Sequence, residues 1–253
     1  MAKIVLAHGI LGFGAVPPFP KSVYFNRIAD HYEAQGNEVL APSVDLLGSL
    51  EVRSAQLAAQ INAWGGDEAI FMLAHSMGGL DCRRVIARYP EIRARVQRLV
   101  TISTPHYGSP VADALLDQHH PLRPHIPSWL VAALGPNAGA LQDLRTRTTL
   151  QDDYVQGVDY LAIGCNSEGM LVPSLLFGLA QKIGQLTHAK NDGVVTLPSA
   201  AGPRTLFETW PVDHGGAIGW PTDLLGISLA AAVVSAPADH IQRYMALLPK
   251  LVE

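Results

Sequence analysis

The sequence predicts an α/β fold with a mostly parallel central sheet and helices on both of its faces. Two observations point to this class. Short apolar runs that suit strands alternate along the chain with longer segments of helical spacing, and such βα units build a parallel sheet. The runs are also apolar at nearly every position, as expected of strands that are covered on both faces.

Each predicted strand is a short apolar run. The first is Lys3–Ala7, which a His-Gly pair closes. The second is Val39–Val44, where Pro42 favours an edge or a bend because proline cannot donate to the ladder. Ala69–Ala74 predicts a buried strand. The remaining strands are expected at Val96–Ser103, Tyr160–Cys165 and Thr205–Trp210.

The predicted helices lie between these strands. Ser22–Gln35 has helical spacing, and a Gly-Asn pair ends it. Ser49–Trp64 carries apolar residues at helical intervals up to a pair of glycines, and Met77–Tyr89 ends at a proline. A long helical pattern covers Pro173–Ala189, and Ala236–Val252 closes the chain as an amphipathic helix.

We expect a single domain over residues 1–253, because no repeat or low-complexity linker divides the chain. The stretch of about 110–150 begins rich in Pro and His and predicts an excursion from the sheet, a small helical lid or cap. Within it, Trp129, Leu130 and Leu134 follow helical spacing. They predict either a mobile apolar lid over a cleft or a fixed cap that completes the core.

The composition limits the classes of function. Apolar residues make up 48% of the chain and charged residues 16%, which excludes a disordered chain. The formal net charge is −4, and no basic stripe is present, so we expect no nucleic-acid partner. A weakly charged surface favours contact with a lipid or an oily substrate.

Nothing in the sequence predicts a membrane span, since the longest apolar candidate, Leu224–Val234, is well below the roughly 18 residues required. The N-terminus predicts a strand rather than a secretion signal. The two cysteines, Cys82 and Cys165, indicate buried thiols rather than a disulfide framework. Together these features favour the cytoplasm, with secretion as the alternative, and they leave the oligomeric state open.

The segment Ala74–Gly79, with the sequence AHSMGG, lies directly between a predicted strand and a predicted helix. A serine at such a tight turn adopts a strained conformation that holds its hydroxyl above the sheet edge. The residues two positions before it and two positions after it must be small. Alanine stands where glycine is usual at the first of these. Ser76 is therefore the candidate nucleophile, the alternative being an idle serine in an ordinary turn. Ser103 and Ser109 lack this setting.

Four segments follow one another along the chain, and a histidine loop near residue 214 comes after them: Val5–Phe13, Ala74–Gly79, Ser103–Ser109 and Asn191–Val195. In these segments and in their order the chain resembles the bacterial true lipases of the α/β-hydrolase fold, the group of the Pseudomonas, Burkholderia and Proteus triacylglycerol lipases. The resemblance spans most of the chain.

A serine nucleophile needs a histidine base and a carboxylate that orients it. In this fold the chain order is Ser, acid, His. His214 follows the last predicted strand, whereas His240 falls within a helix and His188 precedes every convincing acid. Asp192 lies 22 positions before His214, the spacing that the resemblance implies. Its alternative is a plain Asx turn, and its rivals as the acid are Asp213 and Glu168.

The oxyanion hole is expected to use two backbone N–H groups. One belongs to Met77, directly after the nucleophile. The resemblance implies that the other follows the His-Gly pair, which assigns it to Ile10. We expect His8 to order that loop, and His75 and His106 to pack beneath the site.

The chain departs from the resemblance at two places. Some secreted lipases bind calcium through an aspartate two residues after the catalytic histidine, but Gly216 stands here. We therefore expect no metal and no cofactor. The disulfide of some members also has no counterpart, because Cys82 and Cys165 occupy other positions.

The sequence thus predicts a serine carboxylic ester hydrolase, a lipase that cleaves acylglycerol esters through an acyl-enzyme on Ser76. Its expected partner is a lipid or ester substrate, met at an oil–water interface if the lid is mobile, with Trp129, Leu130 and Leu134 as acyl-pocket or lid residues. A short-chain carboxylesterase, thioesterase or phospholipase with the same three residues is the alternative. A non-catalytic binding protein with this fold is the alternative of another class.

Overall fold

The computed structural model describes the chain apart from residues 11–23, 127, 135–138, 147–153, 171–175 and 221–235. Within the described residues, six strands form one sheet in the order β2-β1-β3-β4-β5-β6, and every neighbouring pair is parallel. The predicted parallel α/β sheet is therefore confirmed. The strands are β1 Lys3–Ala7, β2 Glu38–Leu40, β3 Ile70–His75, β4 Val96–Ile102, β5 Asp159–Cys165 and β6 Glu208–Trp210.

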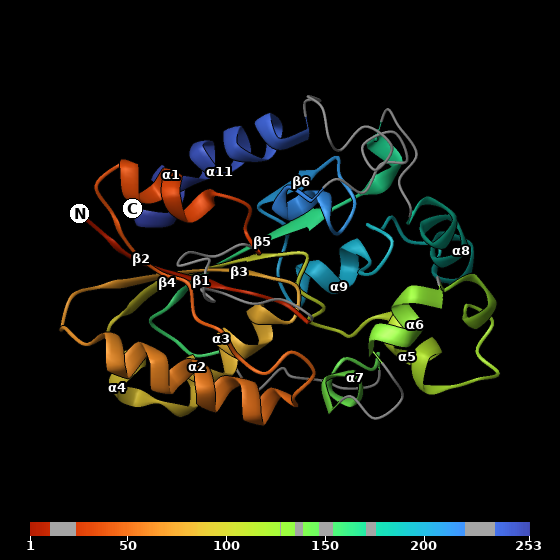
Figure 1. Cartoon of the computed structure of the whole chain (residues 1–253), viewed down its shortest axis with the longest axis horizontal. Coiled ribbons are helices and arrows are strands. Elements are labelled where there is room, and N and C mark those ends of the chain that lie inside the picture. The colour runs from red at the N-terminus through yellow and green to blue at the C-terminus, as the bar shows by residue number, and fades with distance from the viewer. Residues whose placement is uncertain (11–23, 127, 135–138, 147–153, 171–175, 221–235) are drawn as a thin grey trace.

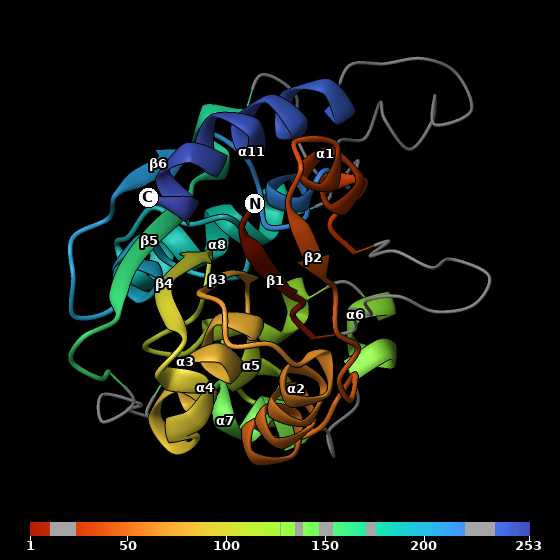
Figure 2. The same ribbon diagram turned by 90° about the vertical axis from the view of Figure 1, so that its left-hand side faces the viewer.

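Helices cover both faces of this sheet (Figure 1). Helices α1 and α11 lie on one face, and α2, α3 and α4 lie on the other, as the view from the side also shows (Figure 2). Two buried apolar clusters fill these two layers. The helices are α1 Ile28–Ala34, α2 Leu50–Trp64, α3 Gly78–Arg88, α4 Pro90–Arg93, α5 Pro110–Leu116, α6 Ser128–Leu134, α7 Gly139–Asp143, α8 Phe177–Thr187, α9 Leu197–Ala201 and α11 Ala236–Val252, with 3₁₀ turns η1 Arg123–His125, η3 Ser167–Gly169 and η4 Gly216–Ile218.

The pairing of β1 with β3 positions the site. Every residue of both strands is buried, and Ala7 lies opposite Ala74 in the register. Because the two strands are parallel, the loop after β1 and the turn after β3 emerge side by side at the same edge of the sheet. His8, Gly9 and Ile10 therefore lie next to Ser76.

The excursion predicted for about 110–150 contains α5, α6 and α7 in its described part. These helices lie beyond the carboxyl ends of the strands (Figure 1). Their apolar faces join a third buried cluster that includes Met77 and Leu80 from the start of α3. The excursion thus covers the edge of the sheet where Ser76 emerges.

Among the described residues, three predicted boundaries are wrong by three residues or more. Strand β2 ends at Leu40 rather than Val44, because the backbone N–H groups of Ser43 and Val44 donate to the side chains of Gln60 and His8 instead of a strand. Strand β6 begins at Glu208 rather than Thr205.

Helix α1 begins at Ile28 rather than Ser22. Asn26 and Arg27 have φ values of 36° and 70°, which no right-handed helix accommodates. Helix α8 begins at Phe177, after residues 171–175, which lie outside the description. In the part of the chain that the structure describes, no helix combines the length and apolarity needed to cross a membrane.

Candidate active site

Strand β3 runs directly into α3 through a tight turn at Ser76, whose φ is 55°. This left-handed conformation is the strain expected of a serine held above a sheet edge. Gly78 is required there, because a Cβ on it would lie 2.4 Å from the carbonyl oxygen of Ala7. Ala74 is fully buried, and the turn tolerates its methyl group.

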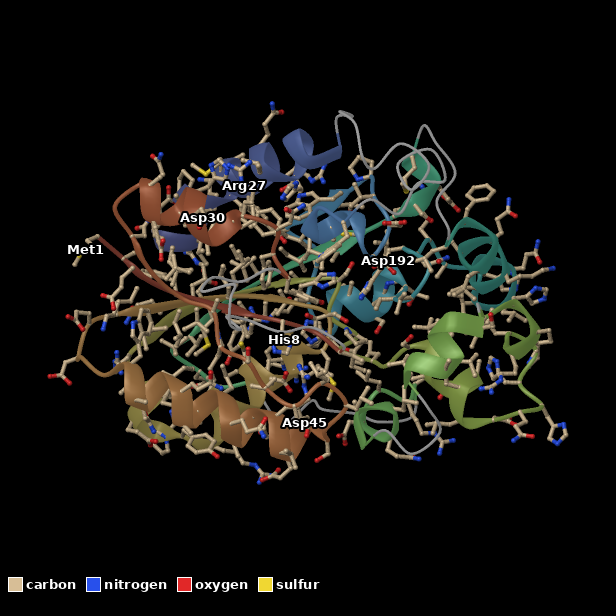
Figure 3. The ribbon with its side chains drawn as sticks, viewed as in Figure 1. Met1, His8, Arg27, Asp30, Asp45 and Asp192 are labelled. Atoms are coloured by element: carbon tan, nitrogen blue, oxygen red, sulfur yellow. The ribbon has the colours of Figure 1, made fainter. Side chains whose placement is uncertain are left out.

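Three side chains from distant segments meet at this turn. Nε2 of His214 lies 3.0 Å from Oγ of Ser76, and Nδ1 of His214 lies 2.8 Å from Oδ2 of Asp192. Asp192 is fully buried, whereas the side chain of His214 is 15% exposed. Asp192 lies beyond the carboxyl ends of the strands, and His8 lies at the end of β1 (Figure 3). The structure thus brings together the three residues that sequence order selected.

The second oxygen of Asp192 is held by the backbone. Its Oδ1 accepts hydrogen bonds from the N–H groups of Val194, at 2.9 Å, and Val195, at 2.7 Å. The predicted Asx turn is therefore present, and it leaves Oδ2 free to face the imidazole. The backbone N–H of His214 also donates to the carbonyl of Asp192 at 3.0 Å. Backbone and side-chain contacts together fix the orientation of both residues.

The rival residues lie elsewhere. Oδ1 of Asp213 accepts from the N–H of Gly216 and so caps the turn after His214. Glu168 is exposed and lies 3.9 Å from Lys190. His188 ends α8, and buried His240 has Nε2 2.9 Å from the carbonyl oxygen of Asn26. None of these four side chains makes a described contact with Ser76 or His214.

The two expected oxyanion donors border the same turn. Met77 directly precedes α3, so its N–H is at the positive end of the helix. Ile10 lines a cavity with Ser76. Gly9 brings the loop close, because a Cβ on it would lie 2.7 Å from Cβ of Ser76.

A buried arginine that the sequence analysis did not single out holds this loop. Arg53 on α2 is fully buried, and its Nη2 donates to Oδ2 of Asp81 at 2.7 Å. The same Nη2 donates to the carbonyl of His8 at 2.9 Å. Because Asp81 lies on α3, the guanidinium ties the loop after β1 to both helices. The sequence could have indicated this role, because Arg53 is a charged residue on the apolar face that Leu50 and Leu57 form along α2.

The cavity next to Ser76 has a volume of about 140 Å³. Ser76 and His214 lie at one part of its wall, and apolar side chains from α5, α6 and α7 form much of the rest. Leu130 and Leu134 both line it, and their role as acyl-pocket or lid residues stays a prediction. The side chain of Trp129 lies outside the described residues.

Three buried histidines surround the site without belonging to the Ser–His–Asp set. Nδ1 of His8 lies 2.8 Å from the carbonyl oxygen of Gly9, and its Nε2 accepts from the N–H of Val44. Burial lowers the pKa of His8 to about 4, and burial holds the pKa values of His75 and His106 well below the usual value. All three rings are therefore neutral in the folded protein near neutral pH.

These histidines predict a loss of stability in mild acid. Below about pH 6.5 the unfolded chain protonates all three, whereas the folded chain does not, so the free energy of unfolding falls as the pH falls. Burial raises the pKa of Asp81 to about 6, so the folded state takes up a proton there. This proton offsets one of the three protons that the unfolded chain takes up on the histidines. The expected slope is about 3 kcal/mol per pH unit between about pH 5 and 6.

Urea unfolding across this pH range measures the slope. His106→Gln is expected to reduce it by one proton, whereas His119→Gln, at an exposed position, is expected to leave it unchanged. A free energy of unfolding that does not change over this range would contradict the assignment of neutral rings.

Within the described ranges, no group of three or more His, Cys, Asp or Glu side chains is arranged to hold a metal ion. Gly216, at the position where some lipases have a calcium ligand, begins η4 and supplies only backbone atoms. The expected absence of a cofactor stays a prediction. Cys82 and Cys165 are both buried free thiols, as predicted.

Parts of the chain are similar to known proteins. Residues 56–120 match the family model of a PGAP1-like alpha/beta domain. Triacylglycerol lipase 2 of Saccharomyces cerevisiae is 35% identical over 101 residues, covering 37% of this chain and 31% of that protein. The triacylglycerol lipase of Pseudomonas fragi is 32% identical over 115 residues, covering 44% and 37%. The matched part of the chain thus spans about a third of the length of these two relatives.

Solved structures cover the whole chain. The mature lipase BlEst2 of Bacillus licheniformis superposes with a TM-score of 0.73 at 21% identity, covering 100% of this chain and 92% of that one. The metagenomic carboxyl esterase MGS0156 superposes with a TM-score of 0.69 at 18% identity, covering 98% and 75%. These likenesses show that the chain shares the fold of these enzymes.

Proposed function

We propose that this chain, which has the α/β-hydrolase fold, is a serine carboxylic ester hydrolase of the lipase and esterase type. One observation carries the proposal: Oγ of Ser76, the imidazole of His214 and the carboxylate of Asp192 form a continuous series at 3.0 Å and 2.8 Å. A serine hydroxyl beside a base that a buried carboxylate orients is the arrangement of an activated nucleophile. The names of the sequence relatives support the same class.

In the proposed reaction, Oγ of Ser76 attacks the ester carbonyl while Nε2 of His214 accepts its proton. Asp192 holds Nδ1–H of the imidazole and stabilises the imidazolium that forms. The N–H groups of Ile10 and Met77 stabilise the oxyanion. His214 then protonates the leaving alcohol, and an acyl-enzyme remains on Ser76. Water, deprotonated by His214, releases the carboxylic acid and restores Ser76. Protein groups and water suffice for every step.

The alternatives differ in what they predict for a serine-directed reagent. A thioesterase or a phospholipase with these three residues would react with a fluorophosphonate as an esterase does, so substrate panels must separate them. A non-catalytic binding protein would fail to react. The left-handed turn at Ser76 favours the enzyme, because such strain is maintained where function requires it. The compartment proposed from the sequence is the cytoplasm, where free thiols such as Cys82 and Cys165 persist.

The cavity volume favours a short acyl group. A buried apolar cavity of about 150 Å³ in another protein holds a benzene molecule, which has six carbons. The cavity beside Ser76, at about 140 Å³, is therefore expected to hold an acyl chain of about four to six carbons. We propose esters of short-chain fatty acids, including short-chain acylglycerols, as the preferred substrates, and the helices of residues 110–150 as the wall of the acyl site.

Hydrolysis of p-nitrophenyl esters from acetate to palmitate tests this prediction. We expect kcat/KM to peak at butyrate or hexanoate and to fall by about tenfold or more at palmitate, because the excess chain extends beyond the apolar lining that the described residues form. Ala112 lines the cavity. Ala112→Leu reduces the cavity volume and is expected to move the maximum of kcat/KM toward acetate. A peak at palmitate would contradict the proposed acyl size while leaving the ester hydrolase proposal intact.

A further inference from the structure

Beside the Ser–His–Asp series lies a second set of side chains that the proposed reaction does not use. It consists of Tyr24, just before α1, and His75, the last residue of β3. The hydroxyl of Tyr24 lies 2.7 Å from Nδ1 of His75. The ring of His75 in turn lies against that of His214, with centroids 4.5 Å apart. Tyr24 and His75 thus extend from the loop after β1 to the proposed base.

The direction of the Tyr24–His75 hydrogen bond follows from its surroundings. Burial raises the pKa of Tyr24 well above its usual value, so the hydroxyl keeps its proton, and the backbone of Gly9 hydrogen-bonds to the hydroxyl oxygen as an N–H donor does. The hydroxyl proton of Tyr24 then remains to be donated to Nδ1 of His75. Burial keeps His75 neutral, because it holds the pKa of His75 well below the usual value. The single ring proton of His75 is therefore on Nε2.

A neutral ring at this place matters to His214. Among the described residues, Ser76 and Asp192 occupy the two nitrogens of His214, and the ring of His75 packs at an angle of 46° beside it. A charged imidazole there would repel the imidazolium that forms on His214. After burial, the nearness of the His214 imidazole lowers the pKa of His75 further, and a hydrogen bond with the backbone of His214 acts in the opposite direction.

The backbone around Tyr24 holds the loop that carries His214. The indole N–H of Trp220 donates to the carbonyl of Tyr24 at 2.9 Å. The amide of Asn26 donates to the carbonyl of Gly219 at 2.6 Å. Asn26 adopts a left-handed conformation with a φ of 36°, so this turn is held in a strained geometry while it bonds the His214 loop.

From this geometry we propose that Tyr24 and His75 are positioning residues for His214, joining the oxyanion loop at Gly9 to the base through one chain of hydrogen bonds and one ring contact. The inference depends on the proposed function, because positioning acquires its meaning from the reaction at Ser76. Asp192 fixes the imidazole through Nδ1, and His75 restrains its face. Gly9 directly precedes Ile10, so the same chain keeps the oxyanion donor and the base in register.

The test compares Tyr24→Phe, His75→Phe and the double variant with Tyr32→Phe as the matched control. Tyr32 is a fully buried tyrosine on α1 whose hydroxyl donates to the carbonyl of Tyr244 at 2.9 Å, away from the site. Each variant is assayed with p-nitrophenyl butyrate, and its active sites are counted by titration with a fluorophosphonate. Nitrogen-15 NMR of the wild-type protein reports which ring nitrogen of His75 carries the proton.

We expect Tyr24→Phe to lower kcat per active site by about tenfold while KM changes less than about twofold. His75→Phe is expected to have a similar effect, and the double variant to be no worse than the more impaired single one, because the two residues act as a unit. Tyr32→Phe is expected to lower the unfolding temperature and leave kcat unchanged.

An unchanged kcat in Tyr24→Phe, or additive losses in the double variant, would overturn the proposal. So would a higher KM at constant kcat, which indicates direct substrate contact instead. A wild-type protein that neither hydrolyses esters nor reacts with the fluorophosphonate would contradict the proposed function. The NMR result would then still decide the positioning chain, since a proton on Nδ1 of His75 contradicts it independently of activity.

Discussion

Ser76→Ala is expected to abolish ester hydrolysis, with kcat falling by about a million-fold. The change removes the only atom that forms the proposed acyl-enzyme, and the oxyanion donors and the cavity stay in place. It removes a single hydroxyl and keeps the Cβ of a residue whose backbone already adopts the left-handed conformation, so the fold is expected to persist. The assay is p-nitrophenyl butyrate hydrolysis beside a thermal unfolding curve.

Ser54→Ala is the matched control for this variant. Ser54 is 2% exposed on α2, and its hydroxyl donates to the carbonyl of Glu51. We expect it to retain wild-type kcat. A Ser76→Ala protein with more than about one per cent of the wild-type activity would show that another group is the nucleophile.

Asp192→Asn is expected to lower kcat by about ten-thousand-fold near neutral pH. Oδ1 of Asp192 already accepts from the N–H groups of Val194 and Val195. An asparagine oxygen keeps these two bonds only by turning its amide NH₂ toward Nδ1 of His214. The imidazole must then accept at Nδ1 and carry its proton on Nε2, where it cannot take the proton of Ser76.

Asp213→Asn separates the two candidate acids. Asp213 neighbours His214, but its Oδ1 accepts from the N–H of Gly216, a bond that an asparagine oxygen preserves. We expect this variant to keep kcat within about tenfold of the wild type. A larger loss in Asp213→Asn than in Asp192→Asn would reverse the assignment of the acid. Reaction rates with the fluorophosphonate check both variants independently of substrate.

Local sequence patterns predicted the centre of the fold. Strands β1 and β3 are uniformly buried, so their apolar runs had one interpretation. The closing helix Ala236–Val252 was predicted at both boundaries. The turn at Ser76 was equally local, since it depends on small residues at fixed positions between a strand and a helix. The predicted resemblance to lipases is confirmed by the sequence relatives over part of the chain, and the predicted fold by a solved structure.

Contacts between distant segments were beyond local patterns. Arg53 meets Asp81 and the carbonyl of His8 at sequence separations of 28 and 45 residues. The left-handed turn at Asn26 depends on Gly219, 193 residues away, so helical spacing alone extended α1 too far. Selecting Asp192 and His214 needed the chain order of the resembling family, because several acids and histidines were equally available.

The most direct test of the central claim is peptide mass spectrometry after reaction with a fluorophosphonate. We expect one adduct, on Ser76, in the wild-type protein. We expect no adduct in Ser76→Ala and a much slower reaction in Asp192→Asn, where the imidazole of His214 carries its proton on Nε2. An adduct on another residue, or an unmodified Ser76 in a folded wild-type protein, would contradict the claim that Ser76, His214 and Asp192 form a hydrolytic site.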